Sequence, residues 1–95
     1  MPDDDRRERR EIHYSGRVQG VGFRYTVRSL AARFDVTGFV RNLSDGRVQL
    51  VVEGSVPEVG RFLDTIATEM GHYIADTRST TESASGRFER FEIRF

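Results

Sequence analysis

The chain has 95 residues and no cysteine, which suits one domain with a small core and excludes disulfides, thiolate metal sites and a cysteine nucleophile. Fifteen basic residues, all of them arginine, balance fifteen acidic residues, so Schiff-base and P-loop lysines are excluded as well. A net charge of zero offers little long-range attraction to nucleic acid or to an anionic membrane, and we expect neither as a partner.

Residues 1–10 interleave arginines with acids and contain no apolar run, which is typical of a charged, disordered tail and not of a secretory signal. No segment of the chain is apolar over the length of a membrane span. We therefore expect a cytoplasmic protein whose single folded domain covers residues 11–95.

Residues 12–15 alternate in character and predict a first strand, which leads into a glycine-rich loop. Residues 16–24 read Gly-Arg-Val-Gln-Gly-Val-Gly-Phe-Arg. Glycine adopts backbone angles that other residues avoid, so such a loop can turn its N–H groups inward and form an anion-binding nest. The helix expected next turns its partly positive N-terminus to the same point, and Arg24 adds a guanidinium suited to phosphate oxygens. The loop therefore predicts a site for a small phosphorylated ligand.

The middle of the chain predicts a helix, a hairpin and a second helix. Apolar residues recur at helical spacing over residues 24–34. Residues 36–43 and 48–53 are rich in β-branched residues and flank an Asp-Gly turn, which predicts a β-hairpin. A capping box at Ser55 and Glu58 opens the second helix, which is expected to stop at Gly71.

The last quarter of the chain predicts two strands. Residues 73–81 are polar and β-branched, as in an edge strand, and Phe91, Ile93 and Phe95 alternate, as in a strand with one buried face. The element order is β-α-β-β-α-β with one further strand. The expected fold is an α+β sandwich of ferredoxin-like type, with an antiparallel sheet of four to five strands and two helices on one face. Because many functions share this fold, the function has to come from the site.

Three familiar phosphate motifs do not fit the loop. Gly22 is followed by Phe23 and Arg24, where a P-loop needs lysine and a hydroxyl residue. Tyr25 stands where a dinucleotide fingerprint needs its third glycine. Val18 stands where a cysteine-dependent phosphatase carries its nucleophile, so a phosphocysteine route is closed.

A second run, residues 38–46, begins Gly-Phe-Val-Arg-Asn and ends in a glycine turn. Together with residues 16–24 it resembles the two signatures of the acylphosphatase family, and the resemblance covers nearly everything after the tail. It implies a small enzyme that hydrolyses the carboxyl–phosphate bond of acyl phosphates to carboxylate and inorganic phosphate, by direct attack of water and without a metal or cofactor. By matching positions, Arg24 binds the phosphate and Asn42 holds the attacking water.

The resemblance also implies that the loop backbone cradles the phosphate, through Arg17, Val18, Gln19, Gly20, Val21 and Gly22 in addition to Arg24. The side chain of Arg17 is expected in solvent. The terminal carboxylate of Phe95 is a candidate partner for Arg24. The sequence departs from the commonest family pattern at Phe39, where tryptophan is frequent, and at Leu43, where a polar residue is frequent, but both catalytic positions are intact.

Two other functions stay open. An acylphosphatase-like module related to the domains of hydrogenase-maturation proteins can bind a phosphorylated ligand or a partner without turnover. An RNA-recognition module shares the ferredoxin-like fold, but the Lys/Arg-Gly-Phe/Tyr strand motifs that it needs for base stacking are absent here. The expected partner is a small acyl phosphate, and a monomer is expected because the sequence shows no surplus apolar face.

Overall fold

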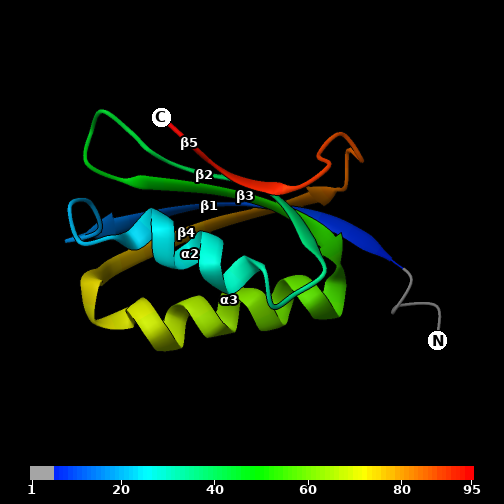
Figure 1. The fold of residues 1–95 in the computed structure, drawn as a ribbon, viewed down its shortest axis with the longest axis horizontal. Helices are drawn as coiled ribbons and strands as arrows, with labels where there is room; N and C mark the ends of the chain where they lie inside the picture. Colours follow the sequence, from blue (N-terminus) through cyan, green and yellow to red (C-terminus); the bar gives the residue numbers. More distant parts are fainter. Residues whose placement is uncertain (1–5) are drawn as a thin grey trace.

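The computed structural model describes residues 6–95 and contains one five-stranded sheet with two helices packed on one face (Figure 1). The strand order is β4-β1-β3-β2-β5. The elements in chain order are β1 (Arg7–Gly16), α2 (Phe23–Ala31), β2 (Val36–Asn42), β3 (Val48–Ser55), α3 (Val56–Met70), the short 3₁₀ helix η1 (Gly71–Tyr73), β4 (Ile74–Ser83) and β5 (Phe91–Arg94). This arrangement confirms the predicted ferredoxin-like α+β sandwich with one extra strand, which is β5.

The sheet is mixed and not wholly antiparallel, which corrects one part of the prediction. Strands β4, β1, β3 and β2 pair antiparallel, but β5 runs parallel to β2, with Val40 opposite Ile93. The short connection after β4 is the reason. Strand β5 has to begin at the end of the sheet where β4 stops, and β2 begins at that same end. The alternation of apolar residues in a strand carries no information about this direction.

Strand β1 is longer than the sequence predicts, because it begins at Arg7. Residues 7–10 therefore belong to the sheet and not to a charged tail, while residues 1–5 of that predicted tail lie outside the described residues. Backbone pairing explains the difference, since Glu8 lies opposite Gly54 of β3 on one side and Ser83 of β4 on the other. A strand held on both sides by ladder hydrogen bonds accepts charged side chains near its end.

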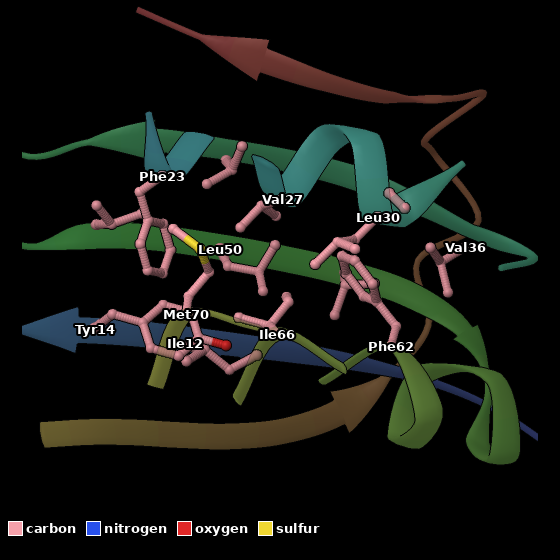
Figure 2. Packing of buried hydrophobic residues seen from close by; sticks show 14 of the residues in the cluster. Ile12, Tyr14, Phe23, Val27, Leu30, Val36, Leu50, Phe62, Ile66 and Met70 are labelled. Atoms are coloured by element: carbon pink, nitrogen blue, oxygen red, sulfur yellow. The ribbon is translucent and has the colours of Figure 1, made fainter. Parts of the chain in front are cut away.

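The core lies between the sheet and the two helices (Figure 2). Both helices present the apolar stripes that helical spacing predicts. The buried members are Phe23, Val27, Leu30 and Ala31 of α2 and Val59, Phe62, Ile66 and Met70 of α3. They pack against strand residues such as Ile12, Tyr14 and Leu50. This packing fixes the position of α2, whose first turn carries Arg24.

The helix ends agree with the sequence only in part. Ser55 caps α3 as predicted, since its hydroxyl accepts a hydrogen bond from the Glu58 N–H at 3.3 Å. The other half of the capping box is wrong, because the Glu58 carboxylate accepts the N–H of Asp35 at 2.8 Å and ties α3 to the start of β2. Gly71 ends α3 with a right-handed φ of −58°, so the chain continues into η1.

One helix and one strand end earlier in the chain than the sequence predicts. Helix α2 stops at Ala31, and a hydrogen bond of the i→i+3 kind from the N–H of Phe34 to the carbonyl of Ala31 closes a tighter turn after it. Strand β5 stops at Arg94, and Phe95 beyond it is 90% exposed, so the predicted buried alternation ends at Ile93.

Gly38 lies in β2 with a φ of 140°, and its position explains the glycine of the second signature. A Cβ atom there would overlap the carbonyl oxygen of Val51 and lie 2.9 Å from its carbonyl carbon. The N–H of Gly38 donates to the carbonyl of Arg90 at 3.0 Å, just before β5. Gly38 thus lets β2 pass closely between β3 and β5, and the same strand ends at Asn42.

Glu53 of β3 is a buried acid in the described part of the chain, with 1% of its surface exposed. Its carboxylate accepts hydrogen bonds from the Ser85 N–H at 2.9 Å, the Ser85 hydroxyl at 2.7 Å and the Gly86 N–H at 3.0 Å. Burial by itself raises the pKa of this carboxyl, but the hydrogen bonds from Ser85 and Gly86 outweigh burial and hold the pKa below its ordinary value. The carboxylate therefore fastens the segment between β4 and β5 onto β3.

Replacing Glu53 with glutamine is expected to destabilise the protein by about 1–3 kcal/mol at neutral pH, because the amide keeps one acceptor and turns an NH₂ group toward donors. A carboxyl with a lowered native pKa contributes stability above its ordinary value of 4.5 and loses it as the pH falls through the native pKa. Urea unfolding at about pH 7 and about pH 3 should show the difference from wild type shrinking at the lower pH. Exposed Glu82, changed to glutamine, is the matched control. A difference that stays constant with pH would contradict the role of the carboxylate.

Candidate functional site

Segments far apart in the sequence meet at one end of the molecule, where the β1–α2 loop lies beside the turn between β2 and β3 (Figure 1). They enclose a pocket of about 200 Å³. Its lining residues are Val18, Gly20, Gly22, Phe23, Arg24, Tyr25 and Asn42. The structure therefore brings Arg24 and Asn42, the two predicted catalytic residues, to the same pocket.

The loop owes its shape to two glycines. Gly20 and Gly22 have φ angles of 79° and 77°, in the left-handed region that other residues avoid. A Cβ atom at either position would meet nothing within 4 Å, so the backbone angle and not crowding selects glycine. Gly22 is the N-cap of α2, and its carbonyl accepts the N–H of Thr26 at 3.0 Å.

The backbone N–H groups of residues 18–22 donate to no acceptor among residues 6–95. The N–H groups of the first turn of α2 have no partner within the helix either, as at any helix N-terminus. No acidic side chain lies in that first turn to compensate them. The loop and the helix end together offer a group of donors and a partial positive charge beside the pocket, which is the requirement of an anion site.

Gln19 ties the loop to the hairpin. Its side-chain Nε2 donates to the carbonyl of Leu43 at 2.8 Å and to the carbonyl of Arg47 at 3.0 Å, which lie 24 and 28 residues further along the chain. Val18 beside it is fully buried and anchors the loop in the core. Sequence reasoning assigned Gln19 to the phosphate cradle and missed this side-chain contact, because a backbone carbonyl carries no signal in the sequence.

The start of the loop is fixed against η1 and β4. The N–H of Arg17 donates to the carbonyl of Tyr73 at 2.9 Å, while its side chain is exposed as predicted. Gly16 has a φ of 123°, and a Cβ atom there would lie 2.6 Å from the carbonyl oxygen of Tyr73. Arg17, Gln19 and Val21, three of the predicted cradle residues, are not among the residues that line the pocket.

Arg24 stands in the first turn of α2, where a cation is unfavourable next to the positive end of the helix dipole. Its side chain forms no ion pair with any carboxylate of residues 6–95, including that of Phe95. Instead, its guanidinium carbon lies 4.8 Å from the centre of the Phe95 ring. The ring and not the predicted carboxylate is therefore the neighbour of Arg24, and the positive charge is left to the pocket.

Asn42 is the last residue of β2 and pairs with Val48 of β3. Its side-chain oxygen Oδ1 is buried and has no hydrogen-bond partner in the described part of the chain. Buried polar atoms nearly always have a partner, and one without calls for an explanation. An acceptor at the wall of an anion pocket is suited to a water molecule that donates one of its protons.

No three side chains of histidine, cysteine, aspartate or glutamate within residues 6–95 lie close enough together to hold a metal ion. Over the same range, none of the helices is both long enough and apolar enough to span a membrane.

Comparisons of the sequence and of the structure with known proteins agree with one another. The family model described as acylphosphatase matches residues 10–93. An acylphosphatase of Syntrophus aciditrophicus is 40% identical over 87 residues, which cover 90% of this chain and 91% of that protein. The solved acylphosphatase from Bacillus subtilis has a TM-score of 0.85 and 31% identity, over 93% of this chain and 99% of that one. Full-length HypF, in its phosphate- and nucleotide-bound form, has a TM-score of 0.82 and 27% identity over 94% of this chain and 12% of that one.

The fold and the pocket define a small α+β sandwich with a glycine-rich loop beside a pocket lined by Arg24 and Asn42. The chain belongs to the acylphosphatase family, since the family model and the relatives cover nearly all of it. The family resemblance of residues 16–24 and 38–46 is thereby confirmed, and with it the prediction of an acylphosphatase, a hydrolase.

Proposed function

We propose that this chain hydrolyses the carboxyl–phosphate bond of small acyl phosphates, with Arg24 and the loop holding the phosphoryl group and Asn42 holding the water. The observation that carries the proposal is the buried, unpartnered Oδ1 of Asn42 on the wall of the pocket that Arg24 also lines. An acceptor for water and donors for an anion are the two groups that this reaction needs side by side.

The loop and Arg24 act on the phosphoryl oxygens. Their negative charge is spread over three oxygens in the transition state, and catalysis of phosphoryl transfer depends mainly on positioning and charge stabilisation. The N–H groups of residues 18–22 and the guanidinium of Arg24 are fixed before the substrate arrives, so they stabilise this charge at little cost in reorganisation.

Asn42 orients the water for in-line attack. An amide is a poor base, so the water proton passes to a phosphoryl oxygen of the substrate as the water oxygen bonds to phosphorus. The bond between phosphorus and the carboxyl oxygen breaks on the far side. A carboxylate leaves without needing a proton, which agrees with a pocket whose lining residues include no acid or histidine.

The alternative is a module that binds phosphate without turnover. The chain matches HypF over 12% of that chain, but it matches the Bacillus subtilis acylphosphatase over 99% of that one, which favours the hydrolase. We extend the proposal to a monomer in the cytoplasm. The balanced charge of the chain supports the absence of a nucleic-acid partner.

The proposal is tested by hydrolysis of benzoyl phosphate in the presence of a chelator. Wild type should release inorganic phosphate, whereas Arg24→Gln should bind phosphate roughly 10- to 100-fold more weakly, because charge-assisted hydrogen bonds are lost. Arg33→Gln removes the same charge from an exposed position and should change neither quantity. Phosphate protection in thermal melting without any hydrolysis would instead identify a binding module.

A further inference from the structure

Three exposed apolar residues line the pocket or adjoin residues that line it. Among the large apolar residues of the described chain, those exposed to solvent are Val21 (37%), Tyr25 (51%) and Phe95 (90%). Val21 lies between two glycines that line the pocket, and Tyr25 lines it directly. Phe95 stacks against the guanidinium of Arg24. Tyr25 of α2 is thus the one of these three that lines the pocket, whereas Val21 of the loop and Phe95 after β5 adjoin lining residues.

Each of the two aromatic rings has an arginine guanidinium beside it, while much of the ring surface stays open. The guanidinium carbon of Arg24 lies 4.8 Å from the centre of the Phe95 ring, and that of Arg28 lies 5.5 Å from the centre of the Tyr25 ring. Contacts of this kind are attractive and orient the ring. Exposed apolar groups gathered at a pocket, beside fixed polar groups, are typical of a ligand site.

The chemistry of the reaction and the size of the pocket together place the acyl group outside the phosphoryl cradle. With the phosphoryl group in the cradle and water held by Asn42, in-line transfer places the leaving carboxylate on the opposite side of phosphorus. The pocket of about 200 Å³ is smaller than the roughly 300–1,000 Å³ of sites that enclose a whole organic ligand. The pocket thus has room for the phosphoryl end, and the acyl group lies at the mouth.

We infer that Tyr25 and Phe95, together with Val21, form an apolar rim that binds the acyl group and makes the chain selective for acyl phosphates with a flat, apolar acyl group. The inference rests on the proposed function. An aryl group gains stacking and buried area against the rings, whereas an acetyl group is too small to cover them.

The test compares benzoyl phosphate with acetyl phosphate in wild type, Tyr25→Ala and Phe95→Ala. The ratio of the two kcat/KM values should favour benzoyl phosphate in wild type and fall by about tenfold in each alanine variant. The inhibition constant of inorganic phosphate should stay within about twofold, because neither substitution removes Arg24 or a backbone N–H of the loop. Tyr25→Phe keeps the ring and should keep the ratio. Circular dichroism melting checks that the variants fold, as substitutions of exposed side chains should.

Three results would overturn the inference. An unchanged ratio in both alanine variants would mean that the acyl group does not touch the rim. Equal losses for both substrates, with weaker inhibition by phosphate, would mean that Phe95 only positions Arg24. Failure of the wild type to hydrolyse either substrate would refute the proposed function itself, whereas hydrolysis of both with a ratio near one would refute the rim alone.

Discussion

Asn42→Ala is expected to lower kcat for benzoyl phosphate by about 100-fold or more while the affinity for inorganic phosphate stays within about twofold of wild type. The split follows from the geometry. The proposed phosphate donors belong to the loop and α2, whereas Asn42 ends β2 and lines the same pocket. Steady-state kinetics gives kcat, and inhibition by phosphate gives the affinity.

The same substitution should leave stability unchanged or slightly raised, because it removes a buried acceptor that has no partner. Ser44→Ala is the matched control, since Ser44 is exposed, lies two residues further along and does not line the pocket. Full kcat in Asn42→Ala would refute the role given to this amide, and a parallel loss of phosphate affinity would move its role from the water to the phosphate.

Gly38→Ala is expected to destabilise the protein by about 2–6 kcal/mol, the sum of backbone strain at a positive φ and of overpacking. The added methyl group would overlap the carbonyl oxygen of Val51, and β2 cannot retreat without losing its pairing with β3 or the Gly38 hydrogen bond to Arg90. Because β2 carries Asn42, activity should fall together with the folded fraction. Denaturant unfolding measures the change.

Alanine substitutions at two other glycines separate the effect of backbone strain from that of overpacking. Gly46 has a φ of 94° but open space around it, so Gly46→Ala should cost only the strain, about 1–3 kcal/mol. Gly60 lies inside α3 with nothing near its Cβ position, so Gly60→Ala should stabilise by about 0.5–1 kcal/mol. Equal costs at Gly38 and Gly46 would show that the contact with Val51 is not what selects glycine.

Much of the candidate site was predictable because its chemistry sits in two short runs. Glycines and an arginine within residues 16–24 predict an anion site on physical grounds, and Asn42 joined them through the family resemblance. The sequence does not show which distant atom or ring a given side chain contacts. The amide of Gln19 binds backbone carbonyls, and the Phe95 ring faces Arg24 across 71 positions of chain.

The fold was predictable where side-chain periodicity reports burial, as in both helices and in the hairpin. The fold was not predictable where backbone pairing and chain connections, and not the pattern of side chains, determine the structure. Residues 7–10 join β1 although their side chains are charged, because all four pair with β3 and residues 8–10 also pair with β4. Glu53 follows the pattern of a solvent-facing strand position and is nevertheless buried, because the segment with Ser85 crosses over it. The direction of β5 depends on where β4 stops.

Two hydrogen bonds from the side chain of Gln19 connect the β1–α2 loop directly to the turn between β2 and β3. The Gln19 amide binds the carbonyls of Leu43 and Arg47, which bracket the turn directly after Asn42. The turn and the loop are therefore linked directly, in addition to their connection through the strands. In the proposed reaction, this link connects the residue that holds the water to the loop that holds the phosphoryl group, whose relative position in-line attack depends on.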